Sequence, residues 1–249
     1  MVRRKIIATI EARMASSRLP GKVLFPVLGK PLLQHMIERV QRSGYLQEVA
    51  IALPDGSAND PIIELAKRIG VPYYQGSEDD VLSRVVDTVR SRNADILVQL
   101  TGDCPLMDYR IIDTCVEKYL ENKWDYVAND LVRTYPIGFD VAVMSFDLLV
   151  STLNEPDLDE VDREHVTTYL VERPERFRHC NVNAPSDLDH PELQVTLDTP
   201  EDYEVIRNIF ENLYPGNPDF SARDVVRYLL ESPDIVGINE QIKRKSKRP

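Results

Sequence analysis

Short apolar runs alternate with longer amphipathic stretches through the first half of this chain. The apolar runs are rich in β-branched residues, which is typical of strands buried on both faces. These predicted strands lie at residues 5–10, 48–53, 72–75, 96–100 and 126–128. Apolar residues at helical spacing predict helices at residues 31–42, 61–69, 80–92, 109–121 and 146–154. The alternation predicts an α/β domain with a mostly parallel sheet and crossover helices.

The alternation breaks after residue 129. Residues 133–143 are interpreted as a loop leading into a strand, residues 164–171 as a helix and residues 193–197 as a further strand. A helix is predicted at residues 200–213, because it begins with proline and carries acidic residues in its first turn. A final helix is predicted at residues 222–231. No internal repeat or low-complexity linker divides the chain, so one domain is expected over residues 1–249.

Composition excludes several classes of protein. No run approaches the roughly 18 apolar residues of a membrane helix, and the apolar run after the basic start is too short for a signal peptide. Cys104, Cys115 and Cys180 lack metal-ligand spacing, which indicates reduced thiols in the cytoplasm and no zinc site. The net charge of −11 argues against general nucleic-acid binding. The basic residues at 243–249 are interpreted as a solvated end.

A cation-rich loop follows the first predicted strand, where open α/β sheets bind ligands. Residues 12–22 read ARMASSRLPGK, which differs from both the P-loop and the dinucleotide fingerprint. Two arginines offer forked donors and one lysine a point charge, so the loop is predicted to hold a triphosphate. A solvated basic loop is the alternative. The residues expected to bind the nucleotide here are Ala12, Arg13, Ser16, Ser17, Arg18, Gly21 and Lys22.

Two aspartates come at the ends of apolar strands. Asp103 lies in TGDCPL and Asp198 in LDTPED. Carboxylates at strand ends face the same cleft as the loop and can bind a hard cation such as Mg²⁺. A turn aspartate and a helix N-cap, respectively, are the alternatives. A reaction in which an oxygen displaces pyrophosphate from the α-phosphorus of a bound triphosphate needs positioning and charge stabilisation but no protein nucleophile. The sequence shows no recognisable arrangement of a nucleophile and a base, as this reaction predicts.

Residues 7–24 closely resemble the first motif of the sugar-acid cytidylyltransferases, which include the CMP-Kdo and CMP-sialate synthetases, and most closely the spore-coat-polysaccharide-type members. The resemblance extends over residues 6–238. It implies a three-layer α/β/α, Rossmann-like nucleotide-diphospho-sugar transferase (GT-A-like) fold that binds CTP on the loop and Mg²⁺ on Asp103 and Asp198. Arg13, Arg18, Lys22 and Asp103 match its catalytic positions. Val23 stands where some members have asparagine, which argues against a CMP-sialate synthetase proper.

The same resemblance suggests where the base and the acceptor bind. Residues 76–84, GSEDDVLSR, are expected beside the base and ribose, with Asp80 and Arg84 as contacts, although helix capping alone could explain the acidic residues. The sugar site is expected in residues 133–140 and 162–167. Its candidate residues are Arg133, Tyr135, Asp140, Glu164 and His165, with structural hydrogen bonding as the alternative.

These segments divide the expected domain into a nucleotide-binding part (about 1–128), an acceptor-binding part (about 129–195), C-terminal helices (about 200–242) and the basic tail. The expected function is Mg²⁺-dependent transfer of CMP from CTP to a sugar acid or related surface-glycan precursor in the cytoplasm, by an enzyme that the resemblance implies is a homodimer. Transfer of another nucleotide is one rival. A metal-dependent glycosyltransferase is a second rival, but it would carry an Asp-x-Asp pair, and residues 102–104 carry one aspartate. A non-enzymatic nucleotide sensor is a third, but it would have lost the loop cations or the aspartates, and all of them are present.

Overall fold

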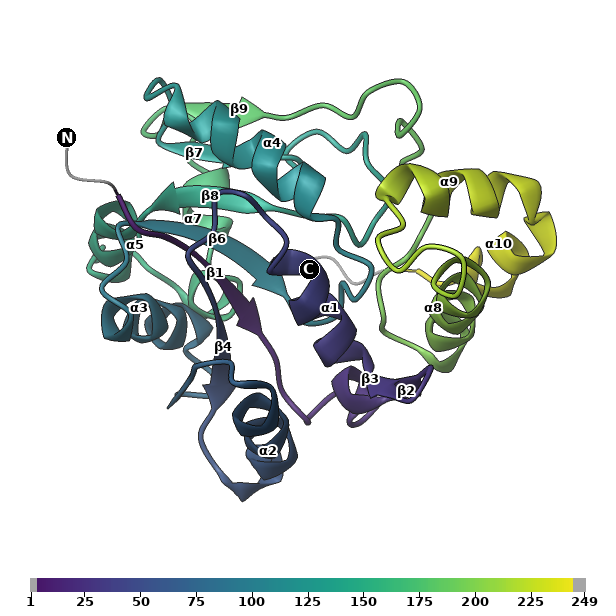
Figure 1. Cartoon of the computed structure of the whole chain (residues 1–249). Helices are drawn as coiled ribbons and strands as arrows, with labels where there is room; N and C mark the ends of the chain where they lie inside the picture. The colour runs from purple at the N-terminus through teal and green to yellow at the C-terminus, as the bar shows by residue number, and fades with distance from the viewer. Residues whose placement is uncertain (1–3, 244–249) are drawn as a thin grey trace.

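A mixed β-sheet forms the centre of the molecule (Figure 1). The computed structural model describes residues 4–243, and within them seven strands form this sheet. Their spatial order is β5 (Tyr73–Gly76), β4 (Glu48–Pro54), β1 (Ile6–Glu11), β6 (Ile96–Thr101), β8 (Ala142–Ser145), β7 (Tyr126–Ala128) and β9 (His179–Asn181). Strand β8 runs antiparallel to both neighbours, and the others run parallel to one another. The predicted α/β class with a mostly parallel sheet is confirmed.

Helices cover both faces of the sheet and give three layers (Figure 1). One face carries α3 (Val81–Ser91), α5 (Phe146–Leu153) and α7 (Thr168–Val171). The other face carries α1 (Leu32–Val40), α2 (Asp60–Ile69) and α4 (Tyr109–Leu120). Three C-terminal helices pack together beside α1: α8 (Pro200–Leu213), α9 (Ala222–Glu231) and α10 (Pro233–Asn239). The shorter elements are η1 (Lys22–Leu24), β2 (Pro26–Val27), β3 (Lys30–Pro31), η2 (Ser57–Asn59) and α6 (Glu160–Glu164).

Strand β1 shows how the sequence builds this core. Its side chains alternate between faces, so Ala8 and Ile10 join the core under α1 while Ile7 joins the core under α3. Both faces are buried, which explains why the strand is a nearly continuous apolar run. Glu11 ends the strand and pairs in register with Thr101 at the end of β6. The polar ends of the two central strands therefore meet at one edge of the sheet.

A buried arginine joins α1 to the C-terminal helices. Arg39 is only 4% exposed and donates hydrogen bonds to the carbonyl oxygens of Leu106 (3.2 Å), Met107 (3.0 Å) and Phe220 (3.0 Å). Burial lowers the pKa of Arg39 to about 10, although the charge of Asp108 opposes this shift. The contacts tie the segment that follows β6 to the segment that precedes α9.

The predicted helices and strands of the first half are observed to within about two residues, as are α5, α8 and α9. The single helix predicted at 164–171 is wrong: Val166 has φ +40° and separates α6 from α7. The predicted strand at 193–197 is also wrong. This segment contacts Ile137 through one isolated bridge at Gln194 and does not join the sheet. Strand β9 and helix α10 were not predicted.

Some expectations concern the ends and the surface of the chain. The basic tail lies outside the described residues except for Lys243. Between residues 4 and 243, no helix combines the length and apolar character needed to cross a membrane. The thiols of Cys104, Cys115 and Cys180 are unpaired, and the first two are buried. Burial raises the pKa of the Cys115 thiol, which makes it a poor nucleophile.

Candidate active site

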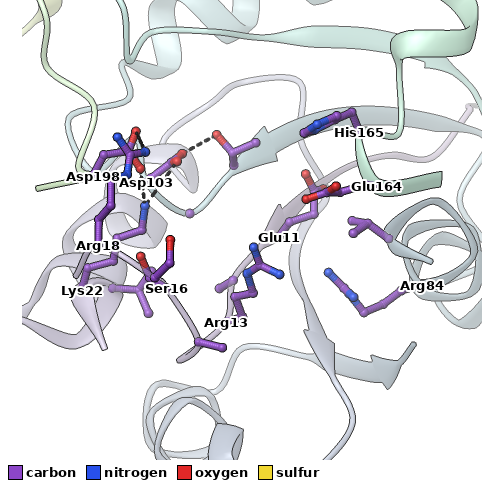
Figure 2. A pocket seen from close by; sticks show the side chains of 17 residues that line it. Glu11, Arg13, Ser16, Arg18, Lys22, Arg84, Asp103, Glu164, His165 and Asp198 are labelled. Carbon is purple, nitrogen blue, oxygen red and sulfur yellow. Dashed lines mark hydrogen bonds and ion pairs between the residues drawn. The ribbon is translucent and has the colours of Figure 1, made fainter. Parts of the chain in front are cut away.

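A cavity of about 340 Å³ opens where β1 and β6 end (Figure 2). Its walls come from the cation-rich loop, the start of α3, the end of β6, the end of α6 and the segment before α8. The lining residues are Glu11, Ala12, Arg13, Ala15, Ser16, Ser17, Arg18, Lys22, Val23, Val81, Arg84, Thr101, Gly102, Asp103, Glu164, His165 and Asp198. Most of the residues predicted to bind nucleotide or metal therefore surround one space. Gly21 and Asp80 do not line it.

Gly21 forms a turn in the loop but does not line the cavity. Its φ of +72° lies in the left-handed region, and its N–H donates to the carbonyl oxygen of Met14 at 2.9 Å. A Cβ at this position would come within 3.3 Å of the Met14 side chain. The N–H of Met14 in turn donates to the Asn59 side chain at 3.0 Å. Glycine suits this turn because it adopts the left-handed backbone without strain, and the turn places Lys22 at the cavity.

The loop cations and the two aspartates form one ion-pair network. Lys22 Nζ lies 2.8 Å from Asp198 Oδ1 and 3.5 Å from Asp103 Oδ2. It also donates to the carbonyl oxygen of Leu197 at 2.6 Å. Arg18 Nη2 lies 2.9 Å from Asp198 Oδ2. Figure 2 shows this group on one side of the cavity and Arg84 on the other, with Arg13 between them.

Asp103 is placed by a tight approach between β6 and β1. The N–H of Gly102 donates to the carbonyl oxygen of Glu11 at 2.8 Å, and a Cβ on Gly102 would come within 2.8 Å of that same oxygen. Only glycine fits here without a shift of the backbone. The Thr101 hydroxyl donates to Asp103 Oδ1 at 2.6 Å and orients the carboxylate. Strand pairing therefore sets the position of Asp103.

Asp198 is not the N-cap of α8, so that alternative is wrong. Thr199 is the cap, and its hydroxyl accepts from the N–H of Asp202 at 3.3 Å in a capping box. The Asp198 carboxylate points to the loop cations instead. The N–H of Leu197 donates to the carbonyl oxygen of Asp103 at 2.8 Å, which ties the two aspartate segments directly to each other.

The donor set fits a magnesium ion that is bound together with nucleotide. The carboxylates of Asp103 and Asp198 already converge on one cation, the Lys22 ammonium group. Within residues 4–243, no set of three His, Cys, Asp or Glu residues is arranged to hold a metal ion without other ligands. Mg²⁺ is commonly bound by one or two carboxylates, with substrate phosphates and water completing its shell.

A second cavity of about 400 Å³ adjoins the first. The two share the side chains of Glu11, Arg18, Thr101, Asp103, Glu164, His165 and Asp198. Arg133 and Asp140 line only the second cavity, where they are paired, with Arg133 Nη2 donating to Asp140 Oδ2 at 3.1 Å. Burial raises the pKa of Asp140, and the hydrogen bonds from Arg133 oppose this shift. Four of the five predicted acceptor residues thus surround this space.

Tyr135 is the exception among the predicted acceptor residues. Its side chain is 3% exposed and contributes to a separate hollow with Asp108, Leu188 and Arg223. Burial raises the pKa of its hydroxyl to about 12. It lines neither of the two adjoining cavities, so the structure does not bring it together with the other four predicted acceptor residues.

The break between α6 and α7 brings Glu164 and His165 to both cavities. It occurs at Val166, whose left-handed backbone is costly for a β-branched residue. Such strain is concentrated at functional sites. The buried Val166 side chain lines the second cavity. The uninterrupted helix that the sequence predicted at residues 164–171 would lack this turn beside Glu164 and His165.

Arg84 and Asp80, the predicted base-side contacts, have different surroundings. Arg84 is 3% exposed and its Nη1 donates to the carbonyl oxygens of Ser77 and Glu78. Its Nε is buried without a hydrogen-bond partner among the described residues. Asp80 caps α3 and lies 2.5 Å from Arg163. The capping alternative is therefore correct for Asp80, and Arg84 remains the candidate.

Sequence reasoning missed Glu11. Burial raises the pKa of this carboxyl to about 8, against the opposing hydrogen bond from Gln99 and the charge of Arg84. The Thr9 hydroxyl also donates to it, at 3.3 Å. Glu11 lines both cavities. Its signal in the sequence is an acidic residue that ends an apolar strand, the same signal that identified Asp103.

Comparisons with known proteins place the chain in a family. The cytidylyltransferase family matches residues 7–226, which is most of the sequence. The chain belongs to the cytidylyltransferase family. The chain is 31% identical over 233 residues to the spore coat polysaccharide biosynthesis protein SpsF of Bacillus subtilis, covering 92% of this chain and 95% of SpsF. The family resemblance inferred from residues 7–24 is confirmed.

Solved structures extend the comparison to the fold. A cytidylyltransferase from Leptospira borgpetersenii superposes with a TM-score of 0.88 at 30% identity, covering 98% of this chain and 100% of that one. CMP:2-keto-3-deoxy-manno-octonic acid synthetase, solved with CTP, gives a TM-score of 0.62 at 21% identity, covering 83% and 98%. The predicted nucleotide-diphospho-sugar transferase fold is confirmed for this family member.

Proposed function

We propose that this cytidylyltransferase family member uses Mg²⁺ to transfer CMP from CTP to a sugar acid or a related surface-glycan precursor, with release of pyrophosphate. The observation that carries the proposal is the convergence of Arg18, Lys22, Asp103 and Asp198 at the junction of two cavities. One cavity has the cations for a triphosphate, and the other has polar walls for an acceptor. We expect a homodimer, as the resemblance implies, and a cytoplasmic location, as the cysteine pattern indicates.

Each group has a role in this reaction. The acceptor hydroxyl oxygen forms a bond to the α-phosphorus, the bond to the pyrophosphate oxygen breaks, and the hydroxyl proton is released. Arg13, Arg18 and Lys22 offset the negative charge that shifts onto the phosphate oxygens. Asp103 and Asp198 would hold Mg²⁺, which supplies Lewis-acid stabilisation of that charge when bound. When the nucleotide is present, the Lys22 ammonium group can exchange its carboxylate partners for phosphate.

The nucleotide assignment is tested by thermal stabilisation. CTP with Mg²⁺ should raise the melting temperature more than ATP, GTP or UTP at equal concentration, because a ligand that binds only the folded state stabilises it. A clear shift with GTP or UTP and none with CTP would reject the cytidylyl assignment. Pyrophosphate release with CTP and 3-deoxy-2-ulosonic acids then measures the transfer itself.

The role of Asp103 is tested by Asp103→Asn. We expect turnover to fall by about 10²-fold or more, since the neutral amide is a much weaker ligand for a hard cation. Asp87→Asn, which changes a solvent-accessible carboxylate on α3, is the matched control. Circular dichroism checks that both variants fold. If Asp103→Asn retains wild-type turnover, Asp103 does not belong to the metal site.

The products distinguish the rival enzyme class. A glycosyltransferase releases a nucleoside diphosphate from a nucleotide-sugar, whereas a cytidylyltransferase releases pyrophosphate from CTP. The tripeptide 102–104 after β6, GDC, carries one aspartate, Asp103, where a glycosyltransferase is expected to carry an Asp-x-Asp pair. We therefore expect pyrophosphate and no nucleoside diphosphate.

A further inference from the structure

A buried carboxylate lies directly behind the proposed metal ligand Asp198. Asp202 is fully buried, and its Oδ2 accepts hydrogen bonds from the backbone N–H groups of Asp198 and Thr199, each at 2.9 Å. These two bonds fix the backbone at the point where the Asp198 side chain leaves it. Asp202 also completes the capping box of α8, so the orientation of Asp198 depends on the first turn of that helix.

The second oxygen of Asp202 is held from another helix. Asn239, the last residue of α10, is 3% exposed, and its Nδ2 donates to Asp202 Oδ1 at 2.8 Å. The same Nδ2 donates to the carbonyl oxygen of Gln194 at 3.1 Å. One amide group therefore contacts the 194–198 segment at Gln194 and, through Asp202, at Asp198. Helix α10 lies beyond residues 7–226, which the family match covers.

We propose that Asn239 is a positioning residue for the metal site, acting through Asp202 on Asp198. The proposal rests on the proposed function. Asn239 fixes the rotation of the Asp202 carboxylate. Asp202 in turn holds the backbone of Asp198, whose carboxylate faces Lys22 and Arg18. Residues that orient metal ligands in this way commonly change metal affinity about 10–100-fold when they are replaced. Helix α10 is then a part of the catalytic apparatus as well as of the packing.

The experiment measures Mn²⁺ binding by electron paramagnetic resonance on the full chain, with and without CTP. Asn239→Ala removes the bridging amide. Val236→Ala is the matched control, because Val236 packs against the core from the same helix and is absent from the hydrogen bonds around Asp202. Asn239→Ser is a milder second variant in case the alanine variant does not fold. Circular dichroism and melting temperature are recorded for every protein.

We expect Asn239→Ala and Asn239→Ser to weaken Mn²⁺ binding in the presence of CTP about 10-fold or more, with Val236→Ala within about twofold of the wild type. Unchanged Mn²⁺ affinity in a folded Asn239 variant overturns the positioning role. Equal weakening by Val236→Ala also overturns it, because α10 would then act only through stability. If the wild type itself binds no Mn²⁺ with CTP, the proposed function fails together with this inference.

Discussion

Glu11 offers a direct test of how the site affects the stability of the fold. We predict that Glu11→Gln stabilises the protein at neutral pH. In the folded state, burial raises the pKa of this carboxyl to about 8, from an ordinary value of 4.5. Below about pH 4.5 the carboxyl is protonated in both the folded and the unfolded chain. As the pH rises toward 8, the unfolded chain releases a proton that the folded chain retains, so unfolding becomes more favourable.

The size of the stability difference follows from the interval between the two pKa values of Glu11, 4.5 and about 8. Each pH unit between the two pKa values is worth about 1.4 kcal/mol, which gives an upper bound of about 5 kcal/mol above pH 8. Glu11 lines an open cavity, and water there reduces the effect. The quantity to compare is the free energy of unfolding of Glu11→Gln minus that of the wild type. We expect this difference to be about 1–3 kcal/mol larger at pH 8 than at pH 5.

Urea unfolding at several pH values between 5 and 8 measures this difference. The charged groups that act on Glu11 are Arg84 on α3 and Asp103 after β6, and both are unchanged in the variant. Glu78→Gln serves as the control, because it neutralises a carboxylate near Arg13 whose side chain is 51% exposed. If the curves for Glu11→Gln and the wild type stay parallel from pH 5 to pH 8, the reasoning about a buried carboxyl is refuted.

Three further predictions concern the supports of the site. Arg39→Met leaves three buried carbonyl oxygens without their donor, and the free energy of unfolding should fall by about 3 kcal/mol or more in chemical denaturation. Gly138→Ala places a Cβ 2.7 Å from the backbone of Val195 at φ +113°, so we expect a loss of about 2 kcal/mol or more and weaker Mn²⁺ binding; unchanged stability would contradict this. Arg84→Gln should weaken CTP binding about tenfold or more by calorimetry, and equal affinity would remove Arg84 from the nucleotide site.

The strands and most helices could be predicted because their signal is local. An apolar run that is buried on both faces keeps its pattern whatever its neighbours are. The segment 164–171 also has a helical pattern, yet Val166, which lines the second cavity, has φ +40° and interrupts the helix there. Residues 193–197 alternate like a strand, but they form only one isolated bridge, between Gln194 and Ile137, and lie outside the sheet.

In the candidate site, too, the residues with a local signal could be predicted, and those that depend on tertiary contacts could not. Asp103 and Asp198 were identified because each ends an apolar run, although the sequence could not say whether Asp198 or Thr199 caps α8, since both residue types are good caps. Asp80 and Tyr135 were placed in the site because they lie in the correct segments. A segment does not show which way a side chain faces. Asn239 carries no local signal, because its partner Asp202 is 37 residues away.

The contact between the two aspartate segments has a consequence for how the protein folds. The hydroxyl of Thr196 reaches the carbonyl oxygen of Asp103 across 93 residues, and Lys22 reaches Asp198 across 176. Closing such long loops has a large entropic cost, which native contacts offset only late in folding. Partly folded chains, even those with β1, β4 and β6 in place, therefore lack the site. Nucleotide binding should appear only with the last cooperative step of folding, and would report on it.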